Sequence, residues 1–184
     1  FLRGQAFRHG EGVTIKQFNG NAVVEAEKVV ESVKTIHDNK GVPYDEIAIA
    51  MYFRKYRPLN YYLESALLNA FSREHIPYNL LYNNDQSWAG RYGDGGVSFI
   101  TFDSVLGLDF QAVVVCGVKP LGAYDKTKQL KKESILDEEQ AENLKKNISY
   151  LYVACTRAKD YLHIVLGESS SQSIYNKLLI DSEK

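Results

Sequence analysis

The hydrophobic and polar positions of this chain change period several times along its length. Residues 13–18 alternate apolar and polar side chains, which is typical of a half-buried strand. A helical period follows, with cap and turn residues at 19–21 and 38–41 marking its two ends. Its apolar side chains return every three or four residues, at Val23, Ala26, Val30 and Val33.

The rest of the chain continues this alternation of strand and helix patterns. Residues 47–52 and 112–117 are apolar without alternation, which is typical of strands covered on both faces in a parallel sheet. Shorter β-type runs occupy residues 78–82, 97–101 and 161–166. A second helical period stops at Ile76-Pro77, because proline disfavours helix in the residue before it. Its apolar positions are Leu59, Leu63, Ala66, Leu67 and Ala70. We therefore predict an α/β sandwich with a largely parallel sheet, in which ligands gather at the carboxyl ends of strands.

Residues 147–159 carry the most informative pattern. Apolar residues at helical spacing predict a buried helix face at Leu144, Ile148, Leu151, Cys155 and Ala158. Arg157 falls off this face, and a helix would hold its guanidinium as a fixed, permanently charged fork for a phosphate. Taken by itself, Arg157 also fits a core helix with one exposed arginine.

Two stretches in the second half of the chain resemble the UvrD/Rep group of superfamily 1 DNA helicases. Residues 151–159, Leu-Tyr-Val-Ala-Cys-Thr-Arg-Ala-Lys, match motif VI throughout. Residues 101–110 resemble motif V, with agreement at Thr101, Ser104, Gly107, Leu108 and Phe110 and with Asp109 in place of glutamate. The resemblance implies that Asp109 binds the nucleotide ribose, that Gly107 approaches the terminal phosphate, and that this stretch runs beside DNA at Thr101 and Ser104.

Motif V also departs from the family pattern. Asp103 stands where the family has histidine, and Leu106 where it has lysine, so positive charge is lost beside the DNA. Without the neighbouring motifs, Gly107 would be read as an ordinary turn and Asp109 as a cap. Because residues 100–110 lead from one predicted strand directly into the next, we expect a tight turn at the sheet edge.

A third stretch, residues 50–54, ends a buried strand with Phe53 and Arg54 and resembles motif IV. The resemblance implies that Phe53 stacks on adenine and that Arg54 contacts the terminal phosphate beside Arg157. The alternative is a core aromatic next to a solvated arginine. If one nucleotide is shared, Phe53, Arg54, Asp109 and Arg157 should converge on a single rim.

The phosphate cradle of such enzymes is absent from the sequence. Gly117 and Gly122 have P-loop spacing, but Ala123-Tyr124 follow where lysine and serine or threonine are required. The resemblance thus implies a RecA-like C-terminal domain, residues 1–184, of a longer polypeptide, inactive alone. ATP, with Mg²⁺, would be held mainly by a preceding N-terminal RecA-like domain. Only residues 83–96 are available for the large insertion that the family places between motifs IV and V.

Composition limits the possible partners. The formal net charge of −1 indicates that any contact with single-stranded DNA is local or shared. Cys116 and Cys155 have no framework or metal-site spacing, so we expect a reducing, cytoplasmic environment and no metal ligands. The expected function is an ATP-dependent DNA helicase or translocase. The alternative, motivated by Asp103 and Leu106, is a helicase-like module that binds a protein such as RNA polymerase without unwinding DNA.

Overall fold

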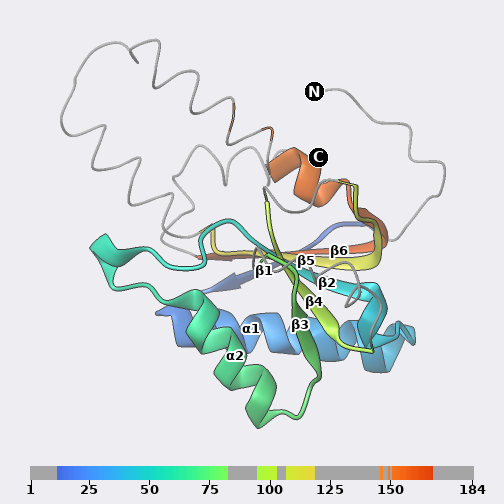
Figure 1. Ribbon diagram of the computed structural model, residues 1–184, viewed down its shortest axis with the longest axis horizontal. Helices are drawn as coiled ribbons and strands as arrows, with labels where there is room; N and C mark the ends of the chain where they lie inside the picture. The colour runs from blue at the N-terminus through green and yellow to red at the C-terminus, as the bar shows by residue number, and fades with distance from the viewer. Residues whose placement is uncertain are drawn as a thin grey trace.

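A six-stranded, all-parallel sheet forms the centre of the computed structural model, which describes residues 12–82, 95–102, 107–118, 146, 149 and 151–167 (Figure 1). The strand order is β1-β6-β5-β2-β4-β3. The predicted α/β sandwich with a largely parallel sheet is confirmed. The strands are β1 (Thr14–Phe18), β2 (Ile47–Met51), β3 (Tyr78–Leu80), β4 (Val97–Thr101), β5 (Phe110–Cys116) and β6 (Ala158–Gly167).

Helices cover both faces of this sheet, which makes three layers. Helices α1 (Ala22–Lys34) and α2 (Leu63–Arg73) pack side by side on one face, and a helical segment at 151–155 lies on the other (Figure 1). Single turns complete the described part of the chain. These are a π-helical turn η1 (Thr35–Asn39) and the 3-10 turns η2 (Tyr44–Glu46) and η3 (Arg57–Leu59).

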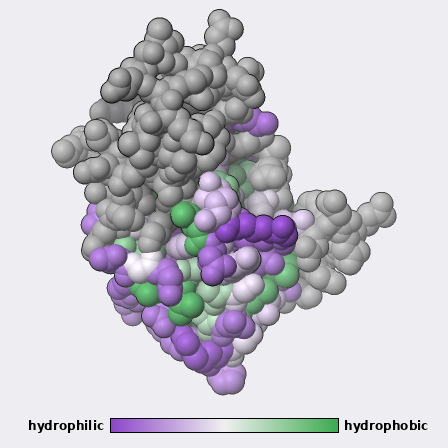
Figure 2. Space-filling model, turned by 90° about the vertical axis from the view of Figure 1, so that its left-hand side faces the viewer, coloured by the Kyte–Doolittle hydropathy of each residue, from purple (hydrophilic) through white to green (hydrophobic). Residues whose placement is uncertain are grey.

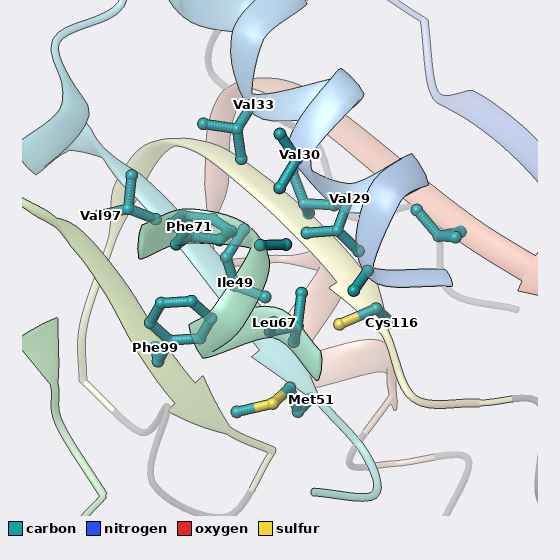
Figure 3. Close-up of a cluster of buried hydrophobic side chains, with 14 of the residues drawn as sticks. Val29, Val30, Val33, Ile49, Met51, Leu67, Phe71, Val97, Phe99 and Cys116 are labelled. Atoms are coloured by element: carbon teal, nitrogen blue, oxygen red, sulfur yellow. The ribbon is translucent and has the colours of Figure 1, made fainter. Parts of the chain in front are cut away.

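The sheet separates two hydrophobic cores. Along β2, Ile47, Ile49 and Met51 belong to the core under α1 and α2, whereas Ala48 and Ala50 face the other core with Leu151 and Ala154. This division follows from the two-residue period of a strand, and it explains why β2 is apolar without alternation. Figure 3 shows the first core, where side chains of both helices meet the sheet, among them Val29, Val33, Leu67, Phe71, Ile49 and Phe99.

The predicted amino end of the first helix is confirmed, whereas α1 ends at Lys34, before the predicted end at 38–41, and the π-helical turn η1 continues to Asn39. Asn21 is the N-cap, and its Oδ1 accepts from the backbone N of Val23 at 3.0 Å and of Val24 at 3.3 Å. These bonds satisfy amides that have no partner within the helix. The predicted inner face is only partly right, because Val23 is 52% exposed and Glu25 is buried in its place.

Two predicted helix boundaries are wrong. The second helix begins at Leu63 and not at Leu59, because Asn60 has a φ of 52° and ends the short turn η3. The helical segment that precedes Arg157 ends at Cys155, residues 156–157 form a turn, and β6 begins at Ala158. The backbone at Arg157 pairs with the sheet and does not continue the helix, since the carbonyl of Arg157 accepts from the N of Phe110 at 2.9 Å. Arg157 is therefore carried by a turn and not by a helix.

The predicted tight turn between β4 and β5 is also wrong. Both strands are parallel to β2 and lie on opposite sides of it. The chain must therefore pass from the carboxyl end of β4, at Thr101, to the amino end of β5, at Phe110. Asp103, Ser104 and Leu106 lie outside the described residues.

Candidate functional site

The residues singled out in the sequence lie at opposite edges of the sheet. Phe53 and Arg54 follow β2, and Thr101 ends β4, so these three lie at the carboxyl edge. Asp109 precedes β5 and Arg157 precedes β6, so both lie at the amino edge. The length of β5 separates the two groups by roughly 20 Å along a parallel strand. The expectation that all four converge on one rim is wrong, because strand direction fixes which end each loop leaves.

At the amino edge, Asp109 and Arg157 contact each other. Nη1 of Arg157 lies 3.4 Å from Oδ1 of Asp109, and the side chains are 26% and 55% exposed. Nε of Arg157 is buried and has no hydrogen-bond partner among the described residues. The pair is therefore a half-buried cation with one buried donor that lacks a partner among the described residues, next to a carboxylate that faces solvent. Gly107, with a φ of +81°, is exposed two residues before Asp109.

At the carboxyl edge, the ends of β2 and β5 are tightly joined. The backbone N of Phe53 donates to the carbonyl of Gly117 at 3.2 Å. Gly117 has a φ of +73°, and a Cβ built there would lie 2.7 Å from the carbonyl oxygen of Phe53. The chain leaves β2 toward β3 on one side and leaves β5 toward β6 on the other. Such a reversal is where open α/β sheets bind ligands.

Phe53 is packed against other aromatic rings. Its ring centroid lies 4.7 Å from Tyr52 and 5.1 Å from Tyr56, and Tyr52 in turn lies 5.1 Å from Phe102. The side chain is half-buried and contacts the second core. This packing agrees with the alternative reading of Phe53 as a core aromatic, although part of the ring still faces solvent.

Arg54 is engaged within the chain. Its Nε donates to Glu64, and its guanidinium lies 4.2 Å from the ring centroid of Tyr82. The hydrogen bond to Glu64 raises the pKa of Arg54 above its ordinary value. Burial raises the pKa of Glu64, but hydrogen bonds from Arg54 and Tyr82 outweigh burial and leave this pKa lowered. Burial also raises the pKa of Tyr82. Arg54 is therefore a held cation and not a freely moving one.

The segment from residue 53 to residue 62, which we call the basic-aromatic loop, concentrates positive charge at this edge. No acidic residue occurs between residues 47 and 63, while Arg54, Lys55 and Arg57 are all exposed. Leu59 and Tyr62 are 48% and 44% exposed. Figure 2 views the side of the molecule on which this loop lies, and hydrophilic and hydrophobic residues are interleaved there.

Sequence reasoning missed Glu25, whose carboxylate is fully buried beneath this loop. One oxygen accepts from the hydroxyl of Tyr61, and the other from the backbone N of Gly117 at 2.7 Å. A signal was present, because Glu25 lies three residues after Ala22 and four before Val29, on the buried stripe of α1. A charged residue at such a position usually has a specific partner.

Both cysteines of the chain lie among the described residues. Cys116 and Cys155 are free, and burial raises the pKa of the Cys155 thiol to about 12 and that of Cys116 well above its usual range.

Among the parts of the chain that the structure describes, we find no helix with the length and apolar character needed to cross a membrane.

Comparison with known proteins finds neither a matching family model nor a matching curated protein. Solved structures do match. The C-terminal domain of a possible DNA helicase from Lactobacillus plantarum WCFS1 is 17% identical with a TM-score of 0.49, over 90% of this chain and 81% of that one. The C-terminal part of the Fun30 ATPase domain is 11% identical with a TM-score of 0.42, over 78% of this chain and 40% of that one. The Pyrococcus furiosus Hef helicase domain is 12% identical with a TM-score of 0.44, over 88% of this chain and 29% of that one.

Proposed function

We propose that this chain is the second RecA-like domain of an ATP-dependent helicase or translocase of the UvrD/Rep type. It would complete the ATP site of a preceding domain and couple hydrolysis to movement on single-stranded DNA. The observation that carries the proposal is the contact between Asp109 and Arg157. The motif resemblance assigns these residues to one nucleotide, and the fold brings them together although 48 positions separate them in the chain.

The chemistry of this pair fits the edge of a nucleotide site. Arg157 is permanently charged and retains a buried Nε donor without a partner among the described residues, which suits an anionic phosphate oxygen. Asp109 is exposed enough to accept a hydrogen bond from a ribose hydroxyl. ATP and Mg²⁺ would be held mainly by the preceding domain, and closure would place Arg157 where charge develops on the transferring phosphate. An arginine supplied in this way contributes about 10³ to 10⁵ in turnover.

Phe53 and Arg54 fit a different role within the same function. They lie roughly 20 Å from the Asp109–Arg157 pair along β5, too far to share its phosphate without rearrangement. They do begin the basic-aromatic loop, whose cations and exposed Tyr62 ring match the requirements of a single-stranded nucleic acid surface. Cations follow the phosphates there and aromatic rings stack on bases. We therefore assign this loop, and not Thr101 and Ser104 alone, to nucleic-acid contact.

Binding of single-stranded DNA at several salt concentrations tests this proposal against the protein-binding alternative. Phosphate contacts release counterions, so a DNA-binding loop predicts an affinity that falls steeply as salt rises. No binding, or an affinity that does not change with salt, would favour a module for a protein partner such as RNA polymerase. The exposed side chains of Leu59 and Tyr62 would then supply the apolar part of that interface.

A further inference from the structure

The buried carboxylate of Glu25 connects helix α1 to the carboxyl edge of the sheet. Glu25 is 0% exposed, and its oxygens accept from the hydroxyl of Tyr61 and the backbone N of Gly117. Burying a carboxylate is costly, and an apolar residue would fill the same space on α1 without that cost. The contacts of Glu25 therefore need an explanation beyond packing.

Each of its two partners controls a different part of the basic-aromatic loop. Gly117 accepts from the backbone N of Phe53 and lies close against that residue, so the position of Gly117 sets where the loop begins. Tyr61 exchanges two backbone hydrogen bonds with Tyr56, at 2.7 Å and 3.1 Å, and these close the loop around residues 57–60. One carboxylate thus fixes both the start of the loop and its closure.

The ring of Tyr61 transmits this restraint to the exposed tip. Tyr61 is only 5% exposed, while residues 57–60 between the paired tyrosines are all exposed. The tip includes Arg57 and Leu59, so the Tyr56–Tyr61 pair helps to fix the position of a cation and of an apolar side chain. Without the hydroxyl contact, the tip would depend on its own local hydrogen bonds.

We propose that Glu25 is a positioning residue that holds the basic-aromatic loop in the conformation that binds single-stranded nucleic acid. This inference rests on the proposed nucleic-acid role of that loop. A binding surface that is already ordered avoids the entropy cost of ordering it on contact. Glu25 itself touches no nucleic acid and acts through Tyr61 and Gly117.

The test uses the 184-residue chain and fluorescently labelled oligodeoxythymidylate, with affinity measured by anisotropy at several salt concentrations. Tyr61→Phe removes the hydroxyl and keeps the ring, and Glu25→Gln removes the charge and keeps the shape. If either variant lowers the binding-competent fraction to a tenth, affinity falls about tenfold. The salt slope should stay unchanged, since Lys55 and Arg57 remain. Hydrogen exchange at the amides of Tyr56 and Tyr61 should accelerate in both variants.

Val33→Ala is the matched control, because it truncates a buried residue of α1 that takes no part in the hydrogen bonds of Glu25 with Tyr61 and Gly117. It should lower the unfolding temperature and leave affinity and loop exchange unchanged. If wild-type chain binds the oligonucleotide and both variants bind it equally well, Glu25 has no positioning role. If Val33→Ala weakens binding as much as they do, the effect is general destabilisation and the inference is overturned. If wild-type chain fails to bind at all, the proposed nucleic-acid function fails instead.

Discussion

Asp109 and Arg157 meet at the amino ends of neighbouring strands, with Nη1 of the arginine 3.4 Å from Oδ1 of the aspartate. The carboxylate accepts from Nη1, while the buried Nε has no hydrogen-bond partner in the described part of the chain. In a parent protein that contains the ATP-binding domain, Arg157→Ala should lower ATP turnover about 10³-fold or more. Nucleotide binding should persist, because the preceding domain holds most of the nucleotide. Steady-state phosphate release and binding of a fluorescent nucleotide measure the two quantities separately.

Arg73→Ala provides the control for that experiment. Arg73 is also an arginine paired with carboxylates, Glu27 and Glu74, but its side chain is 61% exposed on α2. Its removal should leave turnover unchanged. Equal turnover in wild type and Arg157→Ala would count against the proposed role of Arg157.

The 184-residue chain on its own should release no phosphate from ATP above the buffer rate. Two glycine pairs have P-loop spacing, Gly90 with Gly95 and Gly117 with Gly122, and neither is followed by the lysine that would reach the phosphates. A coupled assay for phosphate, with and without single-stranded DNA, checks this expectation. Appreciable hydrolysis that survives repeated purification would show that the chain holds a complete site of its own.

Lys55→Ala and Arg57→Ala should each weaken binding of single-stranded DNA by a similar amount for any sequence. Because each removes one phosphate contact, the slope of log affinity against log salt should fall by about one for each substitution. Lys28→Ala on α1, which removes a lysine paired with Glu31, is the control and should leave the slope unchanged. An unaltered slope in all three variants would place the nucleic acid elsewhere.

Gly117→Ala should destabilise the fold more than Gly41→Ala. Both glycines have positive φ, +73° and +68°, so an alanine is strained at either position. Only at Gly117 would the new Cβ also press on backbone, 2.7 Å from the carbonyl oxygen of Phe53. The strain common to both costs about 1–2 kcal/mol, and the clash adds about 1–3 kcal/mol at Gly117. Urea unfolding of the two variants measures the difference, and equal losses would show that the loop moves aside without cost.

The ion pair between Arg54 and Glu64 should stabilise the fold only above acid pH. The pKa of Glu64 is lower in the folded chain than in the unfolded one, where a glutamate titrates at about 4.3. Its contribution is therefore complete above that value and is lost as pH falls through the lower, folded pKa. Wild type should unfold at higher urea concentration than Arg54→Met at pH 7, and the gap should narrow in acid. A constant gap from pH 7 to pH 3 would show that the packing of Arg54 on Tyr82 matters more than its charge.

The sequence predicts strands and helices well where local pattern decides them. The continuous apolar run of β2 and the Asn21 cap of α1 are examples, because burial on both faces and capping depend on nearby residues alone. The position of Arg157 could not be predicted in this way. Its helix pattern continues through the turn, but pairing of its carbonyl with Phe110, 47 positions earlier, draws the backbone into the sheet.

The geometry of the candidate site likewise depends on long-range pairing that local sequence pattern does not predict. Motif order correctly brings Asp109 to Arg157, but it does not say at which edge of the sheet each loop emerges. Strand direction decides that, and it separates Phe53 and Arg54 from the other pair. Glu25 was missed for a related reason, since its donors come from residues 36 and 92 positions later in the chain.

Strand β5 begins beside the Asp109–Arg157 pair and ends beside Phe53, with hydrogen-bonded neighbours along both of its sides. Because β5 is hydrogen-bonded along both sides, its two ends keep a constant separation. If nucleotide binding rotates the domain about its amino edge toward a neighbouring domain, the carboxyl edge moves along an arc whose radius is the length of β5. A small closing angle at one edge would thus become a larger displacement of the loop at the far edge, without any change inside the domain.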